Sequence, residues 1–171
     1  MEARDLLRER SRPFELALRI RHPSMDPAAI SRELRLEPEH CFKAGEPRSS
    51  SSGIAAAAVH AESCWVGTLD PDAWSEHLAA FAMPTQARSV AAKERLRDAM
   101  MDSIGMALTV TATQFLRTHA DFFRRLQNEG GDAGIIVELP ASSALSFTLT
   151  PQVARVIAEL GIGIDFEFTT D

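Results

Sequence analysis

The chain has 171 residues, of which 45% are hydrophobic and 25% are charged, and its formal net charge is −6. This length is sufficient for one well-buried core, so we expect a single domain over residues 1–171. The acidic balance argues against nucleic-acid binding, which depends on clustered Lys and Arg. No apolar run reaches the roughly 18 residues that a membrane-spanning helix requires, so no membrane partner is expected.

The N-terminal segment and the cysteine content both indicate a cytoplasmic protein. Residues 1–12 alternate acids with arginines and lack the apolar centre of a signal peptide, so we expect an N-terminal arm. The chain contains two cysteines, Cys41 and Cys64, whereas secreted proteins that rely on disulfides usually carry a larger even number. We expect both to be free thiols.

The first predicted elements are a strand, a short helix and a second strand. Hydrophobic and polar residues alternate over residues 14–21, which is the pattern of a half-buried strand. Asp26 provides an N-cap and Pro27 occupies the first helical position. Pro38 ends this helix after about ten residues, because proline disfavours helical geometry in the residue before it. Residues 41–42 predict the second strand.

A polar loop, a strand and another helix follow. Residues 49–61 begin with four consecutive serines and are expected to form a flexible loop. Residues 54–61 are compatible with either a helical turn or an extended segment. Residues 64–69 predict a strand, after which Pro71 starts a helix that ends before Pro84.

The centre of the chain is helical, and residues 83–111 are interpreted as a helical insertion. Apolar residues four apart predict a helix over residues 87–108, and a second apolar stripe predicts a helix over residues 112–129. Gly105 and the β-branched run 109–113 predict a kink or break between them. Apolar residues lie on more than one face of this segment, which is typical of burial on two sides or of an interface.

The C-terminal third returns to strands. Residues 135–139 and 145–149 predict a strand pair joined as a hairpin. Thr150 and Pro151 repeat the combination of N-cap and proline and start the last helix, and residues 164–168 alternate as the last strand. The strand–helix units at the two ends of the chain are either an internal repeat or a product of convergent strand–helix chemistry.

This order of elements predicts an α+β fold. Hairpins are favoured and βαβ crossovers are few, so we expect a two-layer sandwich with a mainly antiparallel sheet and helices on one face. The predicted topology is ferredoxin-like, or two ferredoxin-like half-units that share one sheet.

Several motifs resemble a known family. The segments DPAAISRELRLEPEH, KAGEPR and ESCWVG are similar to those of a bacterial family catalogued as domain of unknown function 4279. The C-terminal LSFTLTPQVARVIAELGIGIDFEF also resembles that family, so the similarity covers most of the chain outside residues 49–61 and 83–111. The resemblance supports the predicted fold. It implies no catalytic residue, because the function of that family is uncharacterised.

Four residues form the candidate ligand- or partner-binding site. Lys43, Glu46 and Arg48 lie in one predicted loop, and the guanidinium of Arg48 is suited to bidentate binding of a carboxylate or phosphate. Trp65, on the following strand, is a candidate to stack on a ligand or partner. The structural alternatives are a solvated turn with a local ion pair and a tryptophan packed in the core.

No catalytic residue, metal site or cofactor is predicted. His40, Cys41, His60 and Cys64 include the donor types of a zinc site, but adjacent residues of a strand point to opposite faces, and no C-x-x-C pair is present.

The sequence therefore favours a non-enzymatic interaction or binding module. In this interpretation the helices of residues 87–128 form a homodimer or contact another protein, and the acidic charge suits a basic partner. The alternative is a small-molecule-binding or catalytic domain that uses residues 43–48 and Trp65 as one side of a pocket. His22, Ser24 and Asp26 have the residue types of a hydrolase triad, but a capping turn explains Ser24 and Asp26.

Overall fold

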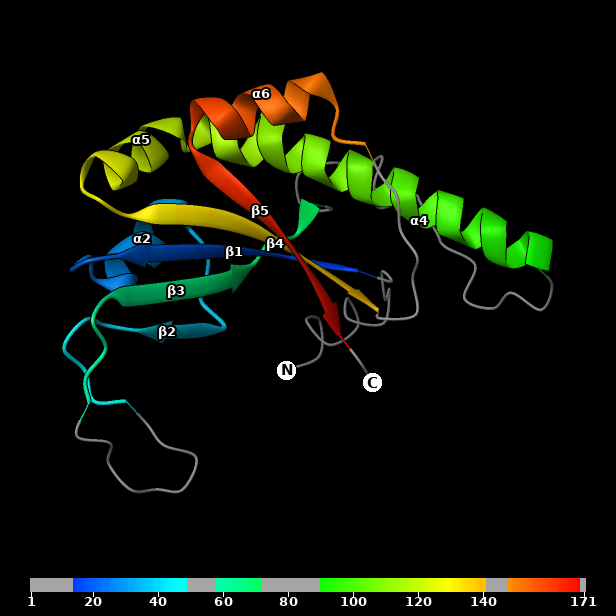
Figure 1. Ribbon diagram of the computed structural model, residues 1–171. Helices are drawn as coiled ribbons and strands as arrows, with labels where there is room; N and C mark the ends of the chain where they lie inside the picture. The colour runs from blue at the N-terminus through cyan, green and yellow to red at the C-terminus, as the bar shows by residue number, and fades with distance from the viewer. Residues whose placement is uncertain (1–13, 49–57, 72–89, 141–147, 170–171) are drawn as a thin grey trace, which may run out of the picture.

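The computed structural model describes residues 14–48, 58–71, 90–140 and 148–169, and their elements lie in two layers (Figure 1). One layer is a five-stranded sheet and the other consists of helices on one face of it. This arrangement confirms the predicted α+β two-layer sandwich with a mainly antiparallel sheet.

Most predicted elements are present, with small shifts at their ends. The strands are β1 (Glu15–His22), β2 (His40–Phe42), β3 (Ser63–Thr68), β4 (Asp132–Pro140) and β5 (Ile162–Thr169). The helices are α2 (Pro27–Leu34), α4 (Val90–Val110), the π-helix η2 (Thr111–Leu116), α5 (Ala120–Asn128) and α6 (Pro151–Glu159).

The strand order across the sheet is β2-β3-β1-β4-β5. The neighbours β2–β3, β3–β1 and β1–β4 are antiparallel, whereas β4 and β5 are parallel. Parallel neighbours cannot be joined by a tight turn and need a crossover connection. Helix α6 lies between β4 and β5 in the chain and supplies that crossover (Figure 1).

The predicted hairpin between residues 135–139 and 145–149 is wrong. Strand β4 has β1 on one side and β5 on the other, so neither side is left for residues 145–149. Thr150 is the N-cap of α6: its backbone is extended, with φ −64° and ψ 146°, and its side chain accepts a hydrogen bond from the amide of Val153 at 3.3 Å. Thr150 therefore caps the start of α6 and is not part of a strand. Residues 141–147 lie outside the described ranges.

The two faces of the sheet differ in composition. Leu16, Leu18 and Ile20 of β1 point to the helix layer and belong to the hydrophobic core. Their neighbours Arg19 and Arg21 project from the opposite face, which we call the open face.

The central helical segment follows the prediction with one difference. Helix α4 passes through Gly105 without a break, and the change of helix type comes at Thr111, where η2 begins. The hydroxyls of Thr109 and Thr113 donate to the carbonyl oxygens of Gly105 and Thr109 at 2.8 and 2.7 Å. Such bonds compete with regular helix geometry, so the β-branched run marks the transition to η2.

Parts of three predicted features lie outside the described residues: the arm 1–12, most of the loop 49–61 and nearly all of the helix after Pro71. Within that loop, Val59 forms an isolated antiparallel bridge with Pro47, so residues 58–60 are not helical. Within the described ranges no helix is long and apolar enough to cross a membrane.

Trp65 anchors α2 to the sheet and requires a glycine two residues away. Its side chain is fully buried, and its indole N–H donates to Oγ of Ser31 in α2 at 2.9 Å. Gly67 lies on the same face of β3, and a Cβ there would be 2.5 Å from Cη2 of Trp65 and 3.0 Å from the carbonyl oxygen of Glu37. The indole of Trp65 therefore occupies the space that a side chain at position 67 would need.

Replacing Gly67 with alanine should destabilise the protein. Overpacking of this kind typically costs about 1 to 3 kcal/mol in the free energy of unfolding, which urea denaturation measures. The matched control is Gly105→Ala in α4, where a Cβ would meet nothing within 4 Å. That variant should gain about 0.5 to 1 kcal/mol, because alanine favours a helix interior over glycine. Equal stability of the two variants would contradict the packing of Trp65 over Gly67.

Candidate functional site

The predicted loop Lys43–Arg48 is a compact turn with one ion pair to the start of α2. Nζ of Lys43 lies 3.1 Å from Oδ2 of Asp26, the residue that caps α2. The carboxylate of Glu46 accepts from the backbone amide of Lys43 at 2.9 Å, and Gly45 provides the left-handed conformation with φ +85°. The hydrogen bond from the amide of Ala28, followed by that from Lys43, lowers the pKa of Asp26.

The other two predicted site residues do not join this turn in a pocket. The backbone amide of Arg48 donates to the carbonyl oxygen of Ala58 at 3.1 Å. Arg48 itself is exposed. Trp65 is buried between the sheet and α2, so its ring has no face open to a ligand. The structure therefore supports the core-packing interpretation of Trp65.

The histidines near the N-terminal half have structural partners. Nδ1 of His22 accepts hydrogen bonds from the backbone amides of Ser24 and Met25 at 3.0 and 2.7 Å, so its lone pair is engaged by the backbone. The rings of Phe42 and His60 stack with centroids 3.7 Å apart. In the described part of the chain, no three His, Cys, Asp or Glu residues converge as metal ligands.

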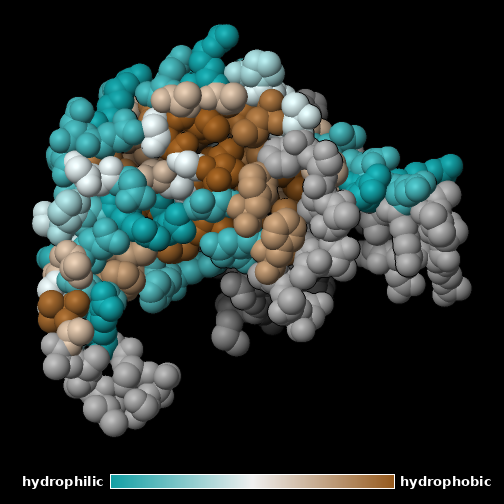
Figure 2. All heavy atoms as spheres, viewed as in Figure 1, coloured by the Kyte–Doolittle hydropathy of each residue, from teal (hydrophilic) through white to brown (hydrophobic). Residues whose placement is uncertain are grey.

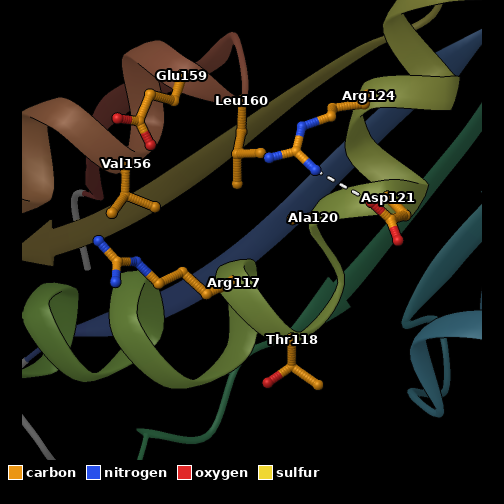
Figure 3. Close-up of a pocket in the computed structure, with 8 residues that line it drawn as sticks. All are labelled: Arg117, Thr118, Ala120, Asp121, Arg124, Val156, Glu159 and Leu160. Carbon is orange, nitrogen blue, oxygen red and sulfur yellow. Dashed lines mark hydrogen bonds and ion pairs between the residues drawn. The ribbon is translucent and has the colours of Figure 1, made fainter.

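A pocket of about 380 Å³ lies between the start of α5 and the end of α6 (Figure 3). Its base includes the buried Val156 and Leu160, and its rim carries two arginines and two acids. The full lining is Arg117, Thr118, Ala120, Asp121, Arg124, Val156, Glu159 and Leu160.

The charges of this pocket balance. Nη1 of Arg124 is 3.0 Å from Oδ1 of Asp121, and Figure 3 shows this pair on one side, with Arg117 and Glu159 on the other. The formal charges of the four side chains sum to zero, and the lining includes no histidine, cysteine or lysine. The pocket therefore offers no surplus charge for an ion.

Three glutamates lie side by side on the open face. Glu15 of β1 is the register partner of Glu138 of β4, which in turn is paired with Glu167 of β5. None of the three forms an ion pair or hydrogen bond with another described side chain. We call Glu15, Glu138 and Glu167 the acidic row.

The central member of the acidic row, Glu138, has a raised pKa. Partial burial, followed by the neighbouring charges of Glu15 and Glu167 and then that of Glu39, raises the pKa of Glu138. Because the folded protein raises this pKa, ionised Glu138 reduces stability at neutral pH, and protonation relieves the effect.

Asp165, which lies on β5 with Glu167, forms an ion pair with Arg19. Nη2 of Arg19 lies 2.5 Å from Oδ2 of Asp165, so the pair spans β4 from β1 to β5. It passes beside Gly134, where a Cβ would be 3.5 Å from that carboxylate oxygen and 3.6 Å from Nη2. The open face of β5 thus carries one compensated acid, Asp165, and one uncompensated acid, Glu167.

The opposite face of β5 exposes hydrophobic side chains. Phe166 and Phe168 are 37% and 54% exposed, and Ile164 is partly buried against the core. Figure 2 shows hydrophobic atoms at the surface between α6 and β5. Within the described chain, β5 is the last strand of the sheet, and no described strand pairs with its outer side, which we call the β5 edge.

The β5 edge was not among the candidate sites predicted from the sequence. The alternation of Ile164, Phe166 and Phe168 with acids identified the strand but not its place at the end of the sheet. The sequence did contain one sign of an unprotected edge, since this strand lacks the lysine and proline that commonly protect exposed edge strands.

The comparisons add no relative: no known protein family, curated protein or solved structure matches this chain. Membership of the family catalogued as domain of unknown function 4279 stays a prediction.

Replacing Glu138 with glutamine should stabilise the protein at neutral pH. Like charges that face each other across strands cost about 0.2 to 1 kcal/mol, and the amide removes this repulsion. The gain should shrink as the pH falls through the raised pKa of Glu138, because the wild-type carboxyl then becomes neutral as well. Urea denaturation over a pH series measures the difference.

The control is Glu94→Gln, since Glu94 is exposed on α4 and has no described ion pair. It removes the same charge without touching the acidic row. If both variants changed stability equally, net charge rather than the acidic row would be responsible.

Proposed function

We propose that this protein is a non-enzymatic interaction module that binds an extended segment of another protein along the β5 edge. The observation that carries this proposal is a side of β5 with which no described strand pairs, together with the ring of Phe168, which is 54% exposed. A strand added to a sheet edge gains main-chain hydrogen bonds, and its alternate side chains contact one face.

The two edges of the sheet differ in how they are protected. Strand β2, at the other edge, has three residues, which is too short to template much pairing. Strand β5 has eight residues, contains neither proline nor lysine, and pairs with β4 without a bulge. A long regular edge with apolar side chains is a site for strand addition.

The homodimer through residues 87–128 has less support. Phe122 and Phe123 are 3% and 0% exposed, so the apolar residues that motivated it are used inside the molecule. The contacts of α6 with α4 and η2 account for burial on a second side. Met106, at 37%, is the large hydrophobic residue exposed in the described part of this segment.

The small-molecule alternative also has less support. It required Trp65 to form a wall of a pocket with the Lys43–Arg48 turn, but the indole is buried and bonded to Ser31.

We further propose a ferredoxin-like assignment for the first four strands. The order β2-β3-β1-β4 with antiparallel neighbours, and helices after β1 and β3, supports it. Helix α6 and β5 then extend this unit by one parallel strand.

A panel of three eight-residue peptides tests the proposed function. Each alternates valine with a second residue, which is lysine, threonine or glutamate, so that all three have valine at every other position and the period-2 pattern of a strand. We expect at least one peptide to shift the NMR signals of the β5 backbone amides. If no member of the panel perturbs β5, the β5 edge is not a strand-addition site.

Phe168→Ser should weaken binding of the best peptide about tenfold, because burial of the exposed half of the ring contributes about 1 to 2 kcal/mol. The matched control is Val59→Ser, since Val59 is 53% exposed and lies near the opposite edge of the sheet. Unchanged affinity for Phe168→Ser, or an equal loss in both variants, would contradict docking at the β5 edge.

A further inference from the structure

The pleat of the sheet determines where the side chains of an added strand would lie. Successive side chains of a strand point to opposite faces, and directly opposed residues on neighbouring strands have Cβ atoms about 4.5 to 5.5 Å apart. On the helix side, an added strand would lie beside Ile164, Phe166 and Phe168. On the open face it would lie beside Asp165 and Glu167.

The described side chains of the open face carry a net negative charge at this position. Arg19 neutralises Asp165, but Glu167 is next to Glu138 and Glu15, and none of these three has a described cation as a partner. Strands are spaced about 4.8 Å apart, so a long basic side chain beside Glu167 also comes within reach of Glu138. Opposite charges across strands stabilise the pairing, whereas like charges oppose it.

Resting on the proposed function of the β5 edge, we propose that its partner is a protein segment in which hydrophobic residues alternate with Lys or Arg. The hydrophobic residues pack beside Phe168 and Ile164, and the basic residues lie over the acidic row. The net charge of −6 on the chain adds long-range attraction for such a segment.

The same charges disfavour a second copy of this chain. Two β5 strands paired antiparallel would bring the uncompensated Glu167 and the acidic row of one copy close to those of the other. The acids therefore protect the edge from self-association while leaving it open to a basic strand.

The peptide panel separates this inference from the proposed function. With NMR titration of the full chain at low salt, the lysine peptide should bind about fivefold to tenfold tighter than the threonine peptide, and the glutamate peptide most weakly. Added salt should reduce the difference, because exposed charges are screened. Equal affinities at the β5 edge would overturn the charge inference and leave strand addition intact.

Substitutions test the role of the acidic row. Glu167→Gln should reduce the preference for lysine over threonine about threefold, because it removes one charge beside the peptide. Glu94→Gln, which removes an equal charge on α4, should leave that preference unchanged. Equal losses in the two variants would show that net charge alone attracts the peptide, and light scattering that detects a dimer through β5 would overturn the proposed partner.

Discussion

The parallel pairing of β4 with β5 determines the rest of the architecture. Because a parallel neighbour needs a crossover, α6 must lie on the sheet between these strands, and its Val153 and Val156 are buried in the core there. The same pairing uses the second side of β4 and makes β5 the last described strand. It also aligns Glu15, Glu138 and Glu167 in one row and allows Arg19 to reach Asp165 past Gly134.

Local sequence chemistry predicted most of the elements. The Asp26-Pro27 and Thr150-Pro151 helix starts are present as N-caps, and the alternation of β1 agrees with its burial, whereas Phe166 and Phe168 of β5 are exposed. These features depend on residues only a few positions apart, so a single sequence contains them. The π-helix that begins at Thr111 was harder to predict, since the β-branched run indicated an irregularity but not its type.

Features that depend on distant contacts were not predictable in the same way. The hairpin prediction failed because the alternation in residues 145–149 does not reveal that both sides of β4 are occupied. Trp65 became a candidate for ligand stacking because the sequence does not show that Gly67 makes room for its ring under α2. The acidic row joins residues from three strands, and only the register brings Glu15 within reach of Glu138.

The central claim is that the β5 edge binds an extended basic segment. Amide hydrogen exchange with and without the alternating lysine peptide tests it most directly, because a strand-edge amide becomes protected when it enters a new ladder. We predict slower exchange at alternate residues of Ile162–Thr169, with little change in β2 or α4. Protection confined to α4 or the pocket beside Arg117, with β5 unchanged, would contradict the claim.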